Sequence, residues 1–196
     1  MNTVQPIRSL EKIKQIEEIL KGESMRNYIL FRLGIYSGLR ISDILNLRVK
    51  DLRGKEYFIL KECKTGKPKM MKIKPELKLE LDEYLEDMND EDFVIGSRER
   101  KDMVTITTRV KNENGKYRNV EQKIKNVATN SPLQRKQAWN IINNVARRVG
   151  ITDAVGTHSM RKSFGYHFYN MYNDNNNRAL SILQQIFNHS SPHITL

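Results

Sequence analysis

Apolar residues recur at helical spacing along most of the chain. Between Ser9 and Gly22 they form a single stripe, which predicts an amphipathic surface helix. The next segment, Met25 to Tyr36, is apolar nearly all round, so we expect a central, buried helix that ends at Gly38. The same spacing and capping signals predict further helices that begin at Pro75, after Ser131-Pro132, at Thr157 and at Arg178.

Three short segments between positions 49 and 73 carry strand and turn signals instead. They are Val49–Arg53, Tyr57–Lys61 and Met70–Ile73, and a brief buried strand is also expected at 93–95. The predicted fold class is therefore α+β, a mainly α-helical domain with a small three-stranded antiparallel sheet at one side.

Residues 97–130 predict a basic hairpin inserted between core elements. Val104, Ile106, Thr108 and Val110 alternate with polar residues, and Asn114-Gly115 is a strong two-residue turn signal. The returning strand would cover 117–120. Such a hairpin could contact DNA, but the pattern favours a solvated excursion.

The net charge of the chain indicates what class of molecule it binds. The 196 residues include 34 Lys and Arg against 23 Asp and Glu, a formal charge of +11, which attracts polyanions such as nucleic acid. A basic protein with no such partner remains the alternative. Cys63 is the only cysteine, so an internal disulfide and a cysteine-based zinc site are excluded. No apolar run approaches the length of a membrane span, and we expect a cytoplasmic protein.

The segment Gly156–Phe164 predicts an anion site at the start of a helix. Thr157 is a suitable N-cap, and His158 and Arg161 lie three residues apart in the first turn, on one face. The exposed amides and the positive end of the helix dipole favour an anion there, so a phosphate site is plausible. A solvated helix start remains the alternative.

Arg40 lies among apolar residues in the turn that follows the central helix. A cation in that setting needs an acidic or phosphate partner, and Asp43 could orient it for a ligand. A purely structural Arg40–Asp43 ion pair remains the alternative.

Other lysines and arginines fall on predicted turns and helix starts. Lys64 and Lys67 lie at a hairpin tip, where a lysine can donate a proton to a phosphodiester or simply keep an edge strand soluble. Arg135 and Lys136, in the first turns of a predicted helix, are candidates for contacts with the DNA backbone.

Four segments together resemble the catalytic domain of tyrosine recombinases of the phage and transposon integrase type. They are Ser37–Asp43, Lys64–Gly66, His158–Arg161 and Asn188–Ser191, in the family's order and at suitable spacing. The resemblance runs from about residue 9 to the end of the chain. It implies site-specific recombination or integration by strand cleavage and rejoining through a 3′-phosphotyrosyl intermediate, without a metal or other cofactor. It also implies double-stranded DNA as partner, assembly as a dimer or tetramer on DNA, and a bacterial or phage-encoded protein.

The resemblance assigns roles to single residues. It implies two arginines that clamp the phosphate oxygens, a lysine that acts as general acid, and two histidines that assist proton transfer: Arg40 and Arg161, Lys64, and His158 and His189. Asp43 would support Arg40. Fixed donors of this kind contribute about 3 kcal/mol each to transition-state stabilisation, and a positioned acid adds roughly 10² to 10⁴ in rate.

Two departures from the family pattern stand out. The family's nucleophilic tyrosine follows the second histidine by about nine residues, whereas this sequence ends at Leu196, seven residues after His189. We therefore expect this chain to bind DNA without cleaving it covalently. Tyr166, Tyr169 and Tyr172 precede that position and are expected in the core or on its flank. The family's amino-terminal core-binding domain is also missing, so residues 1–196 would form one catalytic domain.

Two other functions remain open. A type IB topoisomerase uses a similar arginine, lysine and histidine set, and a non-catalytic DNA-binding module could keep the fold without the chemistry. In each case we expect Arg40, Lys64, His158, Arg161 and His189 to converge on one basic, concave face.

Overall fold

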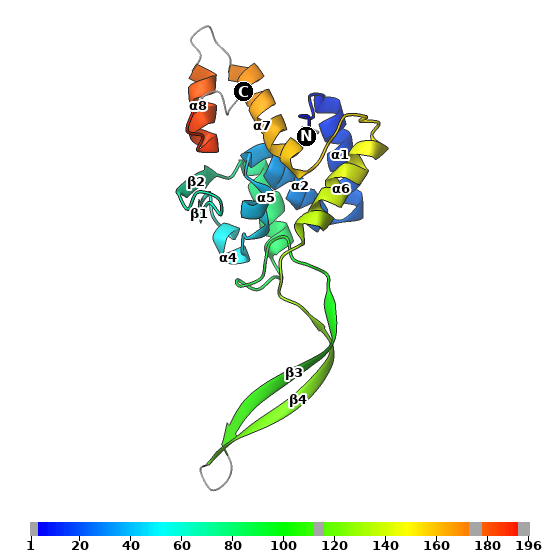
Figure 1. Ribbon diagram of the computed structural model, residues 1–196, viewed down its shortest axis with the longest axis vertical. Coiled ribbons are helices and arrows are strands. Elements are labelled where there is room, and N and C mark those ends of the chain that lie inside the picture. Colours follow the sequence, from blue (N-terminus) through cyan, green and yellow to red (C-terminus); the bar gives the residue numbers. More distant parts are fainter. Residues whose placement is uncertain (1–3, 112–115, 173–177, 192–196) are drawn as a thin grey trace.

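The computed structural model describes residues 4–111, 116–172 and 178–191, and the side chains of 100–104 and 124–128 are left undescribed. Within these ranges the chain forms helices and two separate antiparallel hairpins (Figure 1). The elements in chain order are α1 (Leu10–Glu23), α2 (Met25–Ser37), α3 (Ile41–Leu45), α4 (Val49–Leu52), β1 (Tyr57–Lys61), β2 (Pro68–Lys72), α5 (Pro75–Leu85), β3 (Arg100–Lys111), β4 (Tyr117–Ala128), α6 (Arg135–Arg148), α7 (Thr157–Tyr172) and α8 (Arg178–Phe187).

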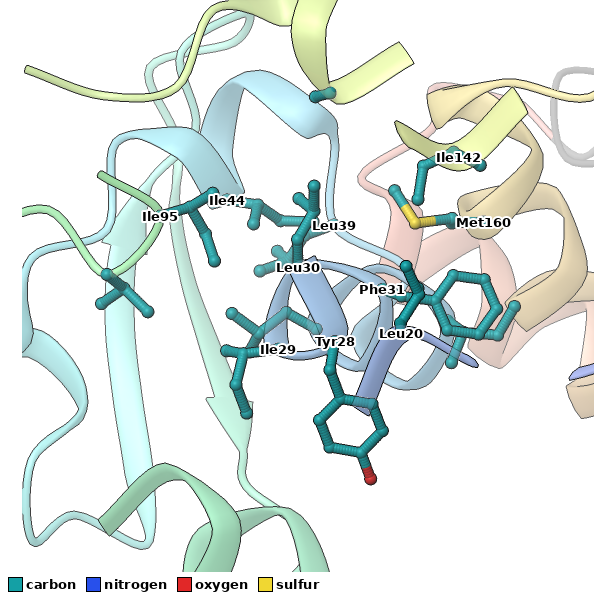
Figure 2. Packing of buried hydrophobic residues seen from close by; sticks show 14 of the residues in the cluster. Leu20, Tyr28, Ile29, Leu30, Phe31, Leu39, Ile44, Ile95, Ile142 and Met160 are labelled. Carbon is teal, nitrogen blue, oxygen red and sulfur yellow. The ribbon is translucent and has the colours of Figure 1, made fainter. Parts of the chain in front are cut away.

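Helix α2 is the centre of the hydrophobic core. As predicted from its nearly uniform apolar sequence, it is buried on several sides, and Ile29, Leu30 and Phe31 are fully enclosed (Figure 2). Each large apolar side chain buried in this way contributes about 1.5–3 kcal/mol. At Gly34 the helix meets α7 so closely that a Cβ atom would lie 2.5 Å from the Met160 sulfur. This close packing of α7 on α2 fixes the position of the predicted anion site.

The α2 helix ends where the sequence predicts. Gly38 follows its last residue in the left-handed conformation, with φ of 62°, which glycine adopts without steric strain. The chain then enters α3 through Arg40, whose extended backbone precedes the first helical turn.

The predicted three-stranded sheet is a two-stranded hairpin, because the first predicted strand is helical. Residues Val49–Leu52 form α4, in which Val49 and Leu52, three positions apart, both turn into the core. The Asp51 carboxylate accepts a 2.8 Å hydrogen bond from the Arg48 backbone and closes this short turn. The buried segment at 93–95 joins the structure through an isolated bridge between Arg48 and Phe93. The broader fold class, mostly helical with small antiparallel sheets, is confirmed.

The hairpin predicted within 97–130 is present and longer than expected. Strands β3 and β4 pair from Arg100 opposite Ala128 to Lys111 opposite Tyr117, and the hairpin projects away from the helical body (Figure 1). The predicted Asn114-Gly115 turn lies outside the described residues. Side chains at 105–111 and 116–123 are exposed, as expected for a solvated excursion. Among the described residues, no helix has the length and apolar character needed to cross a membrane.

Candidate active site

One cavity brings the predicted catalytic set together. It has a volume of about 640 Å³ and lies where α7, α8, the α2–α3 turn and the β1–β2 turn meet. All five residues predicted to converge contribute to its wall: Arg40, Lys64, His158, Arg161 and His189. We call this space the basic cavity. The proximity of these residues is a structural fact, and their individual roles stay predictions.

Arg161 is held rigidly at the inner wall. Its Nη1 donates to the Gly38 carbonyl at 2.7 Å and its Nη2 to the Phe187 carbonyl at 2.9 Å, while the guanidinium carbon lies 4.2 Å from the centre of the Phe187 ring. The residue is only 3% exposed. Burial, followed by the charge of Arg40, lowers the pKa of Arg161. A guanidinium fixed by two carbonyls is preorganised to receive an anion without reorientation.

The start of α7 places His158 and Arg161 as the sequence predicts. The Gly156 backbone donates a 3.1 Å hydrogen bond to the Ser159 hydroxyl, which fixes the first turn. Gly156 also passes beneath Trp139 of α6, because a Cβ atom there would lie 2.5 Å from the indole nitrogen. His158 and Arg161 then follow three positions apart and both reach the basic cavity.

The acidic partner of Arg40 is Glu62, which sequence reasoning missed. Arg40 Nη1 lies 2.8 Å from Glu62 Oε1. Asp43, predicted to support Arg40, instead accepts a 2.9 Å hydrogen bond at Oδ1 from the backbone of Cys63. The extended backbone of Arg40 directs its side chain across to the β1–β2 hairpin, whereas Asp43 is buried within α3 beside that hairpin's backbone. Among the described residues the Arg40 and Asp43 side chains form no ion pair, and the two residues meet only through a 2.9 Å backbone hydrogen bond from Asp43 to the Arg40 carbonyl.

Glu62 is a buried carboxylate at the end of β1, and only 1% of it is exposed. Burial opposes its ionisation, but the hydrogen bond from Thr65 and the neighbouring positive charge of Arg40 outweigh it, so the pKa of Glu62 is lowered. The alternation of inward and outward residues along β1 indicates that this position is buried. Phe58 and Leu60 face inward, and Glu62 continues the same face.

The β1–β2 turn carries Lys64 to the basic cavity. Gly66, with φ of 67°, closes this turn by donating its backbone N–H to the Glu62 carbonyl at 2.8 Å. Lys64 is exposed and lines the cavity, while Lys67 is exposed on the same turn and is not part of the wall. A lysine on an exposed turn can approach a bound phosphodiester from solvent.

The pKa values of His158 and His189 are both lowered, which favours the neutral imidazole. Burial, then the charges of Arg161 and Arg40, lowers the pKa of His189 to about 4. Because arginine can only donate, the 3.3 Å contact between Arg161 Nη2 and His189 Nε2 makes this ring nitrogen the acceptor. Partial enclosure and the nearby Arg161 lower the pKa of His158 as well. A neutral imidazole offers one ring nitrogen as acceptor and the other as donor near pH 7.

Several other side chains have positions that bear on the predictions. Arg8, Lys162, Tyr166 and Tyr169 also line the basic cavity, and of these the sequence had indicated only the tyrosines, as flank residues. The predicted DNA contacts Arg135 and Lys136 are exposed at the start of α6 and do not line it. Within the described ranges, His, Cys, Asp and Glu form no group of three that could hold a metal ion.

Comparison with known proteins identifies the family to which this fold and cavity belong. The sequence profile of the phage integrase family matches residues 9–196. The chain therefore belongs to the phage integrase family.

One relative matches this chain over nearly the whole length of both proteins. The chain is 38% identical over 196 residues to the probable integrase/recombinase YoeC of Bacillus subtilis (strain 168), and the match spans 100% of this chain and 89% of YoeC. It is 25% identical over 182 residues to the tyrosine recombinase XerA of Pyrococcus furiosus, of which it spans 52%. It thus covers about half the length of that recombinase.

Solved structures share the fold. A crystal structure of XerA recombinase superposes with a TM-score of 0.67 at 18% identity, covering 98% of this chain and 60% of that one. The catalytic core of lambda integrase superposes with a TM-score of 0.62 at 12% identity, covering 95% of this chain and 92% of that core. The second match supports the extent of the fold, since it spans nearly all of an isolated catalytic core.

Proposed function

We propose that this chain is the catalytic domain of a tyrosine-type, site-specific DNA recombinase, which breaks and rejoins double-stranded DNA through a 3′-phosphotyrosyl intermediate. The observation that carries the proposal is the convergence of Arg40, Lys64, His158, Arg161 and His189, drawn from four distant segments, on one cavity. Two guanidinium groups, an exposed lysine and two neutral imidazoles suit a phosphodiester, which gains negative charge when it is attacked.

We assign each residue a role in the reaction from its position in the cavity. Arg161, buried and fixed by two carbonyls, and Arg40, anchored by Glu62, bind the non-bridging oxygens of the scissile phosphate. Lys64 approaches from the exposed turn and protonates the departing 5′ oxygen. His158 and His189 hold the phosphate and accept or pass a proton, since their lowered pKa values keep them neutral near pH 7. Lys67, Arg135 and Lys136, which are exposed and lie outside the cavity wall, contact the flanking DNA backbone.

The partners follow from the same proposal. Related structures include XerH bound to its difH substrate and a lambda integrase tetramer bound to a Holliday junction. By analogy, double-stranded DNA is the ligand of this chain, and a dimer or tetramer on DNA is its working assembly. Residues 1–196 act as the catalytic domain, and the reaction takes place in the cytoplasm of the bacterial cell that carries the DNA.

A binding experiment tests the phosphate site. Fluorescence anisotropy with a labelled duplex, measured over a series of salt concentrations, gives the affinity and the number of phosphate contacts. Arg40→Ala removes a charge-assisted contact with a phosphate, so we expect an affinity loss of about tenfold or more and a shallower salt dependence. The control is Arg148→Ala. Arg148 is the last residue of α6, and its exposed side chain pairs with Glu23 of α1. Equal losses for the two variants would contradict the proposed site.

A further inference from the structure

Lys69 lies at a buried position on the inner face of the β1–β2 hairpin, where an apolar side chain is expected. It lies on β2 opposite Leu60 of β1, and the residues that share its inward face are Phe58 and Met71. Its neighbours Pro68 and Met70, on the other face, are exposed. Lys69 itself is only 7% exposed. Lysine is almost never buried to this degree unless it is paired, so its presence on this face needs a reason.

The Lys69 ammonium has no partner among the described residues. Its Nζ is shielded from solvent and makes no hydrogen bond, and it forms no ion pair within 4.0 Å. The Oδ2 oxygen of Asp43 is also buried without a hydrogen bond. An unpaired buried charge is unfavourable, because water is removed and nothing replaces it. The site is therefore electrostatically incomplete as it stands.

The charges that surround Lys69 cancel one another. The charges that act on it are those of Arg40 and Asp43 at the start of α3, Glu62 just after β1 and Arg161 from α7. Two guanidinium cations and two carboxylates sum to zero, whereas a phosphodiester in the basic cavity carries one negative charge. Lys69 is the enclosed group whose proton would give this cluster a net charge of the matching sign.

The titration of Lys69 is consistent with such a role. Burial, followed by repulsion from Arg161 and Arg40 that outweighs attraction to Glu62 and Asp43, lowers the pKa of Lys69 to about 8. A bound anion beside both arginines would offset that repulsion and favour the charged form. Proton affinity and anion affinity at this site must then rise together, by thermodynamic linkage.

We propose that Lys69 is a positioning residue of the phosphate site, whose charged form supplies the cluster's net positive charge and which, at alkaline pH where its amine is partly neutral, takes up a proton from solvent when a phosphate binds beside Arg40 and Arg161. The inference rests on the proposed function of the basic cavity as a phosphate site. The step is balanced as one proton transferred from water or buffer to the Lys69 amine, with no bond in the DNA made or broken. The charged lysine then compensates the two carboxylates, so that Arg40 and Arg161 act on the phosphate.

Sulfate is a suitable probe, because it presents phosphate-like oxygens and its charge is constant between pH 7.5 and 9.5. Nuclear magnetic resonance of the arginine side-chain N–H groups reports binding at Arg40 and Arg161, and the Lys69 side-chain carbon reports protonation directly. We expect sulfate affinity to fall on the order of tenfold between pH 8 and pH 9.5, because one pKa unit corresponds to tenfold in affinity. We also expect the Lys69 titration to move to higher pH when sulfate is present.

Variants separate an electrostatic role from a structural one. Lys69→Arg keeps a permanent charge, so it should bind sulfate as tightly at pH 9.5 as at pH 8. Lys69→Met keeps the apolar stem without the charge, so it should bind weakly and without the pH dependence. Lys69→Gln repeats that test with a polar end, in case the methionine variant folds poorly. The control Lys72→Met changes an exposed lysine of the same strand, which lies over Tyr57, and should behave as the wild type.

The outcomes are distinct. Unchanged sulfate affinity and pH dependence in folded Lys69→Met and Lys69→Gln would overturn the role of Lys69 while leaving the phosphate site intact. A Lys69 titration that does not respond to sulfate, although Arg40 and Arg161 do, would overturn it as well. Absence of any sulfate response at Arg40 and Arg161 in the wild type would contradict the proposed function itself, and this inference with it.

Discussion

Arg161 donates a 2.7 Å hydrogen bond from Nη1 to the carbonyl oxygen of Gly38, a residue 123 positions earlier in the chain. This contact joins the end of the central helix α2 to the first turns of α7. The carbonyl is available because Gly38 adopts φ of 62°, and the glycine leaves room for the rings of Phe164 and Phe187. The geometry of the basic cavity thus depends on a glycine that does not line it.

Gly38→Ala should destabilise the protein and disturb Arg161. A Cβ atom at this position would lie 2.6 Å from the Phe164 ring and 2.9 Å from the Phe187 ring, in addition to the strain of a positive φ. The strain alone is worth about 1–2 kcal/mol, and the clash adds to it. Urea unfolding measures the total loss in the free energy of unfolding.

Gly54→Ala is the matched control for this substitution. Gly54 has a similar φ of 67°, but a Cβ atom there would meet nothing within 4 Å. It should therefore show only the backbone strain, on the order of 1 kcal/mol. Equal losses for the two alanine variants would show that the rings of Phe164 and Phe187 do not constrain the turn.

Glu62→Gln should be costly because the carboxylate it replaces is buried and paired. Removing the charge leaves Arg40 without its ion-pair partner and weakens the 2.7 Å hydrogen bond from Thr65. We expect a loss of about 1–3 kcal/mol in the free energy of unfolding. Glu91→Gln removes an exposed ion pair with Lys50, also at 2.7 Å, and should cost less than about 1 kcal/mol. A Glu62→Gln loss as small as that of Glu91→Gln would contradict this account of the Arg40 anchor.

His189 should make stability depend on pH in a defined window. In the unfolded chain its pKa is about 6.5, whereas burial and the neighbouring arginines lower the pKa of His189 to about 4 in the folded protein. The unfolded state therefore binds more protons between these values, and stability falls as the pH drops through that window. Well above pH 6.5 the residue has no effect.

His189→Asn removes this contribution. Urea midpoints at pH 7 and pH 5 should differ less in the variant than in the wild type. If the two proteins lose the same stability between these pH values, His189 is not held neutral by its surroundings in the way described.

The β3–β4 hairpin should be dispensable for folding. Its described side chains are exposed, and a two-stranded hairpin alone contributes little stability in water. Replacing residues 106–122 by Asn-Gly would join Thr105 to its partner Lys123 through a favourable two-residue turn. The melting temperature should stay within about 2 °C of the wild type. Leu30→Ala, in the core, should cost about 2–5 kcal/mol by comparison, and a similar loss on shortening the hairpin would contradict its independence.

The sequence predicts elements and single positions better than it predicts pairings between them. The buried α2, its end at Gly38 and the start of α7 follow from local patterns, so they could be placed from the sequence. The 49–52 segment was misassigned because four residues fit either a strand or one helical turn, and the Arg48–Asp51 cap decides between them.

Local sequence patterns do not predict which side chains from distant parts of the chain contact each other. Asp43 was chosen as the support of Arg40 because it is three residues away, whereas the observed partner, Glu62, arrives from the far end of β1. The sequence gives no sign that Lys69 is buried, and only the strand register shows that it faces inward. In both cases the charge pattern suggests solvent, and burial on the inner face of a hairpin overrides it.

The most direct test of the central claim is a covalent trap with a suicide DNA substrate that carries the recombination site of the protein's own element. The protein used is this chain together with any residues that its gene encodes after Leu196. We predict a DNA-linked band on a denaturing gel that is lost in Arg40→Ala and Arg161→Lys and retained in Tyr166→Phe and Tyr169→Phe. The absence of a band from folded, DNA-binding protein, or a band that survives both arginine substitutions, would contradict the account and favour a non-catalytic DNA-binding module.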